Sequence, residues 1–415
     1  MQDSDVARGA PDIKAILEAR ELLSGLFPAT PVLTPRPSRG ALPGSVRTLH
    51  LKAENLQVTG SFKIRGAYNR IARLSEPGGV IAASAGNHAQ GVALAASMLS
   101  REATIVMPEE TPLIKVERTG ALGARVVLHG GSFEEALDHA VALGRAEKLV
   151  FVHAYEDRDV IAGQGTIGLE IGDVLPDVDA ILVPVGGGGL ISGIALATKG
   201  KKGRAAIIGV QASGAAPTAA LFRGGKGASA PLHKAETIAD AIRFKEASAV
   251  TLPIIRQHVD EMLTVTDEEI AGAILWLMEE AKLVVEGAGA VGVAAVLAGR
   301  VPARYGTVAA VISGGNIDLN LIARVVEQGL ARGGRYLVVR CRIPDRPGKL
   351  FSMLAHLAQL RVNVLDVRHN RAGWRIPLGV VEVELLAETR NAEHAREIVA
   401  SLAQAGFDVE RVERT

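Results

Sequence analysis

The sequence predicts an α/β protein with parallel sheets, followed by a smaller α/β domain. Three observations lead to this fold class. Short apolar runs alternate with helix-length segments through residues 50–320, which is typical of parallel strands joined by crossover helices. The length of 415 residues suits two or three domains of about 150 residues each. Apolar residues make up 48% of the chain and glycine fills 46 positions, so a large buried core is expected and disorder is excluded.

The predicted strands of the first region are short and apolar. They are VIAAS (80–84), ATIVMP (103–108), ARVVLHG (124–130), AILVPV (180–185), AIIGVQ (206–211) and TVAAVIS (307–313). Helix-length segments such as HAQGVALAASMLS (88–100) and FEEALDHAVALGRAE (133–147) lie between them. Residues 180–198 carry no charge, but four consecutive glycines divide this stretch. We therefore expect a strand, a loop and a helix there rather than a membrane span.

A second pattern begins after GLARGGRY (329–336). RYLVVRCRI, VNVLDVRHN, LGVVEVELLAE and FDVERV read as strands, and PGKLFSMLAHLAQL and AEHAREIVASLAQAG as amphipathic helices. Leu350, Leu354 and Leu357 share one face of the first of these helices, and Gly406 closes the second. The order βαββαβ predicts a ferredoxin-like domain at 335–415. The remaining chain, 1–330, is expected to form a large domain (about 1–50 and 151–330) and a small one (about 51–150).

Charge and composition exclude several functions. The net charge of +1, with 3% aromatic residues and no basic stripe, speaks against nucleic acid or an anionic membrane as a partner. Cys341 is the only cysteine, which excludes a disulfide framework and fits a reducing compartment. Because the N-terminal residues lack an apolar signal core, we expect a cytoplasmic protein. The ten histidines show no ligand spacing, so no catalytic metal is expected.

The stretch VPVGGGGLISG (183–193) predicts a phosphate site. Gly186, Gly187, Gly188 and Gly189 follow a buried strand, and Leu190 opens a helix. Consecutive glycines free backbone N–H groups to surround an anion at a helix N-terminus. The dinucleotide fingerprint fails because Ser192 stands where the third glycine is needed, and no GKS or GKT is present. A cofactor with one phosphate fits this loop better than a nucleotide.

Three further segments carry candidate functional groups. In TGSFKIRGA (59–67), Lys63 has a small polar approach and a glycine behind it, which suits a lysine that reaches a bound cofactor. In SAGNHAQG (84–91), Asn87 can donate to an oxyanion, although the residues alone favour a helix cap. In VISGGNID (311–318), Ser313 ends a strand and can meet a ring nitrogen. Together with the glycine loop they describe a pyridoxal phosphate site.

Five segments in order resemble the threonine dehydratases (threonine ammonia-lyases), which are tryptophan-synthase-β-like, fold type II pyridoxal phosphate enzymes. They are TGSFKIRGA, SAGNHAQGVA, IAGQGTIGLEI, VPVGGGGLISG and SGGNID. The C-terminal part resembles an ACT domain, with DRPGKL (345–350) at its first strand–helix turn. The resemblance implies β-elimination of L-threonine to 2-oxobutanoate and ammonia, and of L-serine to pyruvate, with pyridoxal 5'-phosphate as cofactor.

The resemblance also implies a role for each candidate residue. Lys63 would bind the cofactor covalently and remove the α-proton, and Phe62 would flank the cofactor ring. Asn87 would donate to the phenolic oxygen, and Ser313 would face the pyridine nitrogen. The phosphate would lie on Gly186, Gly187, Gly188, Gly189 and Leu190, and the substrate carboxylate on Ser84, Ala85, Gly86, Asn87 and His88.

Several alternatives remain open at the level of sequence. Serine racemases are similar but carry serine where this chain has Ala85, so we expect dehydration with little racemisation. The segment TIADAIRFKEASAVT (237–251) departs from the family pattern at Ala241, which leaves another hydroxyamino acid such as 3-hydroxyaspartate as a possible substrate. HAYEDRDV (153–160) also lacks the usual prolines. A non-enzymatic alternative is an amino-acid sensor.

Other expectations concern structural partners and regulation. Glu170 and Glu286 lie in family-like segments, and we expect structural partner roles for both. By resemblance the ACT-like domain senses an amino acid near Gly348, with isoleucine or valine as the expected effector. The same domain predicts a dimer or tetramer. Isoleucine biosynthesis and threonine catabolism are both compatible with the sequence.

Overall fold

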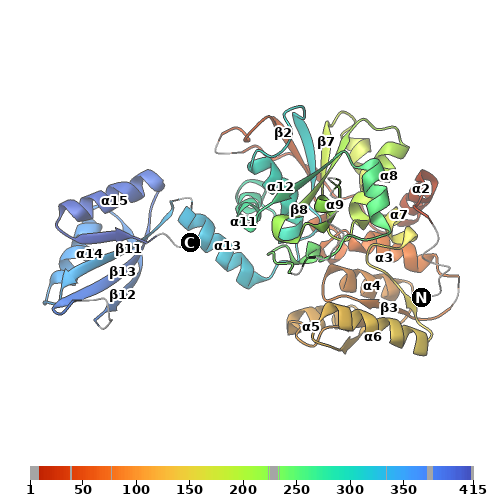
Figure 1. Ribbon diagram of the computed structural model, residues 1–415, viewed down its shortest axis with the longest axis horizontal. Coiled ribbons are helices and arrows are strands. Elements are labelled where there is room, and N and C mark those ends of the chain that lie inside the picture. Colours follow the sequence, from red (N-terminus) through yellow and green to blue (C-terminus); the bar gives the residue numbers. More distant parts are fainter. Residues whose placement is uncertain are drawn as a thin grey trace. The chain divides into compact units, whose positions relative to one another are not determined.

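The computed structural model describes residues 9–37, 40–75, 77–222, 224, 232, 234–332, 334–371 and 377–412. The chain divides into two compact units, Met1–Asp318 and Leu319–Thr415 (Figure 1). The two-domain catalytic core and the ferredoxin-like C-terminal domain predicted from sequence match this α/β architecture. The predicted domain limits of 1–330 and 335–415 stay a proposal.

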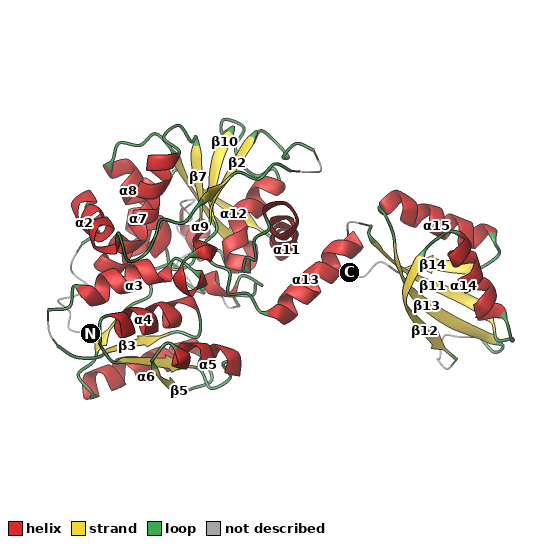
Figure 2. Ribbon diagram, turned by 180° about the vertical axis from the view of Figure 1, so that it is seen from behind, coloured by secondary structure: helices red, strands yellow, loops and turns green. Residues whose placement is uncertain are grey.

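The larger sheet of the first unit has six strands in the order β1-β2-β10-β7-β8-β9. They are β1 Val32–Leu33, β2 Thr48–Lys52, β10 Thr307–Val311, β7 Ala180–Pro184, β8 Ala206–Ala212 and β9 Glu261–Val265. All neighbouring pairs are parallel except β1 with β2. The strands are near-continuous apolar runs because helices cover both faces of a parallel sheet. Ile181 and Val183 pack with residues of α7 (Arg158–Val174) and α8 (Gly189–Gly200) on one face. On the other face, α12 (Gly287–Leu297) lies against β7 and β10 (Figure 2).

The second sheet of this unit is smaller and fully parallel, in the order β5-β4-β3-β6. It consists of β5 Arg125–Leu128, β4 Ala103–Met107, β3 Val80–Ala83 and β6 Val150–Phe151. Alternate residues of β3 face opposite sides, as the period of a strand requires. Val80 and Ala82 pack with α3 (Lys63–Ala72) and α4 (Asn87–Met98), whereas Ile81 and Ala83 pack with α6 (Phe133–Ala146).

The remaining helices of the first unit complete its layers. They are α2 Ile13–Leu23, α5 Leu113–Ala121, α9 Pro217–Phe222, α10 Thr251–His258 and α11 Asp267–Trp276. Within the described ranges, none of the helices combines the length and the hydropathy that a bilayer-spanning segment needs. The uncharged stretch 180–198 forms β7, a glycine turn and most of α8, as predicted.

Helix α7 makes glycine-mediated contacts on two sides. A Cβ on Gly163 would lie 2.7 Å from the Cα atom of Gly66 on α3. A Cβ on Gly193 of α8 would lie 2.6 Å from the backbone nitrogen of Gly165 on α7. Side chains normally hold helix axes about 8–10 Å apart, so only glycine permits these two approaches. The segment IAGQGTIGLEI therefore places α7 directly against both α3 and α8.

The second unit contains α13 (Leu319–Arg332) and the predicted βαββαβ order. The elements are β11 Tyr336–Pro344, α14 Lys349–Gln359, β12 Asn363–Asn370, β13 Val380–Glu388, α15 Ala392–Gln404 and β14 Asp408–Arg411. The sheet is antiparallel in the order β12-β13-β11-β14, as in a ferredoxin-like fold. Leu357 is buried and Leu350 and Leu354 pack against the same core, which confirms the predicted helical face. Gly406 has φ +85° at the end of α15, a backbone conformation that favours glycine.

Candidate active site

Lys63 is the first residue of α3 and lies beside the end of strand β10. The chain enters α3 through a short bridge between Ser61 and Gly314, and the Phe62 N–H donates to the Ser313 carbonyl at 3.1 Å. The Lys63 ammonium donates to the Ala154 carbonyl at 3.0 Å and lies 5.3 Å from the centre of the Phe62 ring. The segments TGSFK and SGGN, about 250 residues apart in sequence, thus meet at one point.

The environment of Lys63 raises the fraction of its neutral amine above that of an ordinary lysine. Desolvation by the surrounding protein lowers the pKa of Lys63 to about 8, and the nearby Glu286 carboxylate opposes this shift. At pH 7 roughly a tenth of the side chains therefore carry no proton. An ordinary surface lysine is neutral far more rarely, so the site makes Lys63 a better nucleophile and base.

The glycine loop joins β7 to α8 as predicted. Gly188 precedes the helix with φ +86°, a conformation that glycine adopts without strain. A Cβ on Gly187 would lie 2.4 Å from the Tyr155 ring, and one on Gly188 would lie 2.4 Å from Thr251 Oγ1. Thr251, the first residue of α10, donates through Oγ1 to the Gly187 carbonyl at 2.7 Å and so fixes the loop. The first N–H groups of α8 have no partner within the helix, which suits a phosphate.

The segment SAGNH lies between β3 and α4, but two of its five N–H groups already have partners. The Ser84 N–H donates to the Val106 carbonyl at 3.1 Å. The Gly86 N–H donates to Ser84 Oγ at 3.2 Å, which leaves the Ser84 hydroxyl free to donate elsewhere. Asn87 and His88 occupy the first turn of α4, where N–H groups lack helical partners. The predicted carboxylate site therefore reduces to the Ser84 hydroxyl and the N–H groups of Ala85, Asn87 and His88.

The side chain of Asn87 does not cap α4. Gly86 is the N-cap residue and no side-chain bond caps this helix, so the capping interpretation of Asn87 is wrong. Instead Asn87 Nδ2 donates to Glu286 Oε1 at 2.8 Å, and Asn316 Nδ2 donates to Asn87 Oδ1 at 2.8 Å. Burial, with a smaller contribution from Asp240, raises the pKa of Glu286 to about 7. Glu286, for which we expected a structural role, thus lies within the site.

His88 is buried and uncharged. Burial and then the Lys63 charge lower its pKa to about 3. Its Nε2 lies 2.9 Å from the Val152 carbonyl, which can only accept, so Nε2 carries the proton and Nδ1 is an acceptor. His88 is therefore held in one tautomer behind the segment SAGNH and does not act as an acid at neutral pH.

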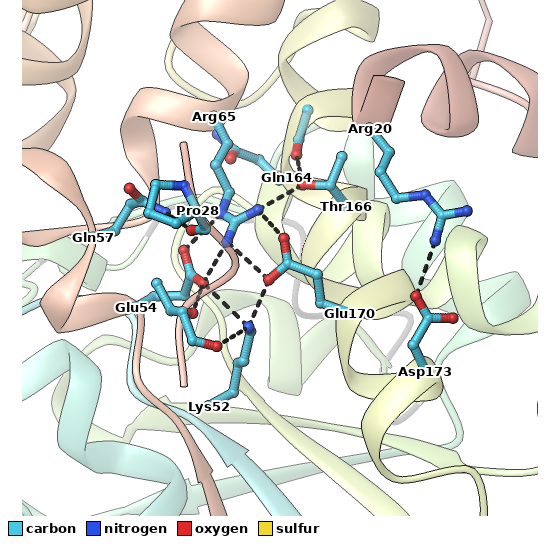
Figure 3. A network of polar contacts seen from close by, with 12 residues as sticks. Arg20, Pro28, Lys52, Glu54, Gln57, Arg65, Gln164, Thr166, Glu170 and Asp173 are labelled. Atoms are coloured by element: carbon cyan, nitrogen blue, oxygen red, sulfur yellow. Dashed lines mark hydrogen bonds and ion pairs between the residues drawn. The ribbon is translucent and has the colours of Figure 1, made fainter. Parts of the chain in front are cut away.

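Arg65, two residues after Lys63 on α3, is the centre of a buried charge network (Figure 3). The Arg65 guanidinium binds Glu54 through Nε at 2.8 Å and Nη2 at 2.9 Å, and Glu170 through Nη1 at 2.5 Å and Nη2 at 3.0 Å. Lys52 adds a 2.5 Å ion pair with Glu170. The two bases and two acids balance each other in charge. Glu170 is thus a structural partner of Arg65, as expected.

Both departures from the family pattern meet at the glycine loop. Tyr155 of HAYEDRDV and Phe244 of segment 237–251 form an edge-to-face pair with ring centres 5.2 Å apart. A Cβ on Gly186 would lie 2.9 Å from Phe244 Cε2. Ala241 is exposed in the short turn Asp240–Ile242, and its neighbours Ile242 and Phe244 lie against Gly186. Sequence reasoning missed the contacts of Tyr155, Phe244, Thr251 and Asn316. For Asn316 a signal was present, since it follows Ser313 within the same motif.

Comparisons with known proteins agree with this geometry. Residues 24–314 match the family described as "Pyridoxal-phosphate dependent enzyme". The chain is 49% identical over 364 residues to an L-threonine ammonia-lyase of Thermotoga maritima, which covers 87% of this chain and 90% of that protein. It is similar to the structure of threonine deaminase isoform 2 from Solanum lycopersicum, with TM-score 0.68 and 35% identity over 77% of this chain and 89% of the other. It is also similar to maize serine racemase, with TM-score 0.71 and 33% identity over 78% and 99% of the two chains.

Proposed function

The chain belongs to the family of pyridoxal-phosphate dependent enzymes, and we propose that it converts L-threonine into 2-oxobutanoate and ammonia. The observation that carries the proposal is the position of the Lys63 amine near two other segments. It donates to the carbonyl of Ala154, next to Tyr155, whose ring packs on the glycine loop, and its charge acts on His88 of the segment SAGNH. An L-threonine ammonia-lyase that is 49% identical over most of the chain supports the choice of substrate.

The residues present fit pyridoxal 5'-phosphate. The cofactor needs an amine for its aldehyde and a dense set of N–H donors for its phosphate. Lys63 supplies the amine with a pKa of about 8. The loop Gly186–Gly189 has no room for a side chain at Gly187 or Gly188, so glycine is required at both positions. The N–H groups at the start of α8, which follows directly, have no partner within the helix and suit a phosphate. In this arrangement Leu190 would add its N–H, Phe62 would flank the ring and Ser313 would face the ring nitrogen.

The chemistry divides between the cofactor and the side chains. The bound cofactor acts as an electron sink for the pair of electrons left when the α-proton is removed. Lys63 removes that proton from the substrate, since its amine is the base nearest the site and is neutral in part at pH 7. Ser84 Oγ and the N–H groups of Ala85, Asn87 and His88 hold the substrate carboxylate.

The α-proton and the β-hydroxyl leave together as the elements of one water molecule, which completes the elimination. Ser313, a hydroxyl rather than a carboxylate, does not hold the ring nitrogen protonated, which favours prompt elimination over a long-lived carbanion. The product hydrolyses to the 2-oxo acid and ammonia. L-serine offers the same β-hydroxyl, so we expect pyruvate from it.

The racemase alternative depends on Ala85. A racemase needs a second acid on the face opposite Lys63, and alanine has no proton to give. The similarity to maize serine racemase concerns the fold and does not supply this acid. Dehydration with little racemisation is therefore the function that these residues favour over racemisation.

We also propose a regulatory role for the C-terminal unit. A ferredoxin-like domain with Gly348 at φ +86° before α14 is compatible with an ACT domain that binds an amino acid such as isoleucine or valine. A dimer or tetramer and a cytoplasmic location are part of the same proposal, as is a role in threonine catabolism. The sensor alternative has no use for a nucleophilic Lys63 beside a glycine cradle.

The experiment is a 2-oxo acid assay with purified protein, pyridoxal 5'-phosphate and L-threonine. Wild type and Lys14→Ala, which removes an exposed lysine of α2, should form 2-oxobutanoate, and Lys63→Ala should lose at least about 10³-fold in kcat. Comparing L-threonine, L-serine and 3-hydroxyaspartate tests the substrate. Full activity of Lys63→Ala would contradict the proposal, and turnover of 3-hydroxyaspartate alone would correct the substrate.

A further inference from the structure

Asn87 belongs to a directed row of hydrogen bonds that crosses the site. Asn316 Nδ2 donates to the Thr59 carbonyl at 2.7 Å and to Asn87 Oδ1 at 2.8 Å, and Asn87 Nδ2 donates to Glu286 Oε1 at 2.8 Å. The row joins four sequence segments, TGSFK, SAGNH, VVEG and SGGN. Asn87 and Glu286 are almost fully buried, with 7% and 5% of their surface exposed, so water does not compete for these bonds.

The Thr59 carbonyl oxygen determines which atoms donate and which accept in this row of hydrogen bonds. The Thr59 carbonyl oxygen can only accept, so the side of Asn316 that faces it must be the amide nitrogen. That nitrogen also faces Asn87, so the facing atom of Asn87 must be its oxygen. The remaining atom of Asn87, its nitrogen, then points at a Glu286 oxygen. No other assignment of the two amides satisfies all three contacts, although amide orientation is often ambiguous in proteins.

Two glycines leave the space that the row needs. A Cβ on Gly314 would lie 2.4 Å from Glu286 Oε1 and 3.1 Å from Asn87 Nδ2. A Cβ on Gly60, which has φ +71°, would lie 2.8 Å from Asn316 Oδ1. A side chain at either position would displace a member of the row. These glycines of the first and last segments therefore accommodate Asn316, Asn87 and Glu286.

We propose that Asn316 and Glu286 are positioning residues that hold the Asn87 amide with its N–H group, and not its oxygen, toward the cofactor. The amide nitrogen of Asn87 has two hydrogens, and Glu286 takes only one of them. The second is available for the phenolic oxygen of pyridoxal phosphate. The inference rests on the proposed function in that it needs the cofactor next to Lys63, but it does not depend on which hydroxyamino acid is the substrate.

A conservative substitution should alter the orientation of the Asn87 amide at Asn316 but not at Glu286. In Asn316→Asp the carboxylate cannot donate to Thr59 or to Asn87, and its charge repels Asn87 Oδ1. The Asn87 amide can then turn over and present its oxygen to the cofactor, because Glu286, with a pKa of about 7, can take up a proton and donate it to the turned oxygen. In Glu286→Gln an acceptor oxygen remains for Asn87, so the row keeps its direction. Asn363→Asp makes the same chemical change at an exposed position of the second unit and serves as the control.

The test uses the absorption spectrum of the cofactor-loaded protein. An oxygen facing the phenolic group favours the form in which that group keeps its proton, and this form absorbs at shorter wavelength. The ratio of the short-wavelength to the visible band should rise about three- to tenfold in Asn316→Asp, as expected for the reversal of one hydrogen bond. It should stay at the wild-type value in Glu286→Gln and Asn363→Asp. If Asn316→Asp does not fold, Asn316→Ala should shift the ratio in the same direction by a smaller factor.

The outcomes separate the two proposals. A wild-type spectrum in both Asn316 variants, or an equal shift in Glu286→Gln, overturns the positioning roles. A wild-type protein that binds the cofactor but does not dehydrate L-threonine overturns the proposed substrate alone, and the spectral comparison still decides the roles of Asn316 and Glu286. Failure of the wild-type protein to take up the cofactor overturns both.

Discussion

Replacing Arg65 by methionine tests the buried charge network of Arg65, Lys52, Glu54 and Glu170. Methionine keeps most of the volume and removes every donor. Arg65 is 1% exposed, and the change leaves the fully buried Glu54 without its two guanidinium bonds. Glu170 loses two more. Lys52 remains, but its nitrogen lies 4.0 Å from Glu54, too far to replace them.

The size of the effect follows from this burial. Removing one partner of a buried ion pair destabilises a protein by about 3–5 kcal/mol, because the other charge is left uncompensated. The unit that contains the network spans residues 1–318. At about 2.1 cal/mol/K per residue, its unfolding entropy is about 0.7 kcal/mol/K. The melting temperature of Arg65→Met should therefore fall by about 4–7 °C.

The assay is thermal unfolding of the cofactor-free protein at one fixed scan rate, with Arg20→Met as the matched control. Arg20 makes a single 3.0 Å contact with Asp173, and the side chains are 38% and 68% exposed (Figure 3). Such a surface pair contributes at most about 1 kcal/mol, so the control should lose less than about 2 °C. Equal shifts for both variants would refute the reasoning, since they would mean that burial adds nothing to the Arg65 contacts.

Three further predictions concern the site. The pKa of Lys63 is about 8, and only the neutral amine attacks the cofactor aldehyde. The rate of covalent cofactor uptake should therefore rise about tenfold per pH unit below pH 8 and level off above it. Stopped-flow absorbance measures this rate, and a rate independent of pH from 6 to 9 would be inconsistent with the prediction. Thr251→Val removes the 2.7 Å bond to the Gly187 carbonyl and should raise the cofactor Kd about fivefold in a fluorescence titration, so an unchanged Kd would exclude a role for this bond. Wild type should form little D-serine from L-serine and Ala85→Ser should form more, as measured by chiral chromatography; rapid D-serine formation by wild type would defeat the argument from Ala85.

Local patterns were sufficient for most of the fold. Strands such as Ala180–Pro184 and Ala103–Met107 are apolar, short and bounded by turn residues, and these signals lie within each segment. The strands Val32–Leu33 and Val150–Phe151 have only two residues each, too few to show an alternation of apolar and polar side chains, and they were not predicted. The order of strands was not predictable, because β2 lies beside β10 although some 255 residues separate them.

The site shows the same division between local and distant signals. Lys63 and the glycine loop stand out because their own neighbours are unusual. Asn87 was ambiguous, since the segment SAGNH suits both a cap and a ligand, and the contact that decides comes from Asn316, 229 residues later. The Tyr155–Phe244 pair likewise joins two segments that are each unremarkable alone. Which side chain meets which depends on tertiary packing, and that information is spread over the whole chain.

The double glycine contact of α7 has a consequence for the tolerance of this site to change. Lys63 begins α3, the glycine loop leads into α8, and α7 lies between these two helices. On both sides the separation is set by backbone atoms, which have no rotamers through which to adjust. In the proposed binding mode the cofactor would reach from Lys63 to the glycine loop, and the distance between those two points is set by the thickness of α7. Side chains that face the substrate can change without altering this distance, whereas a single methyl group at Gly163 or Gly193 would change it.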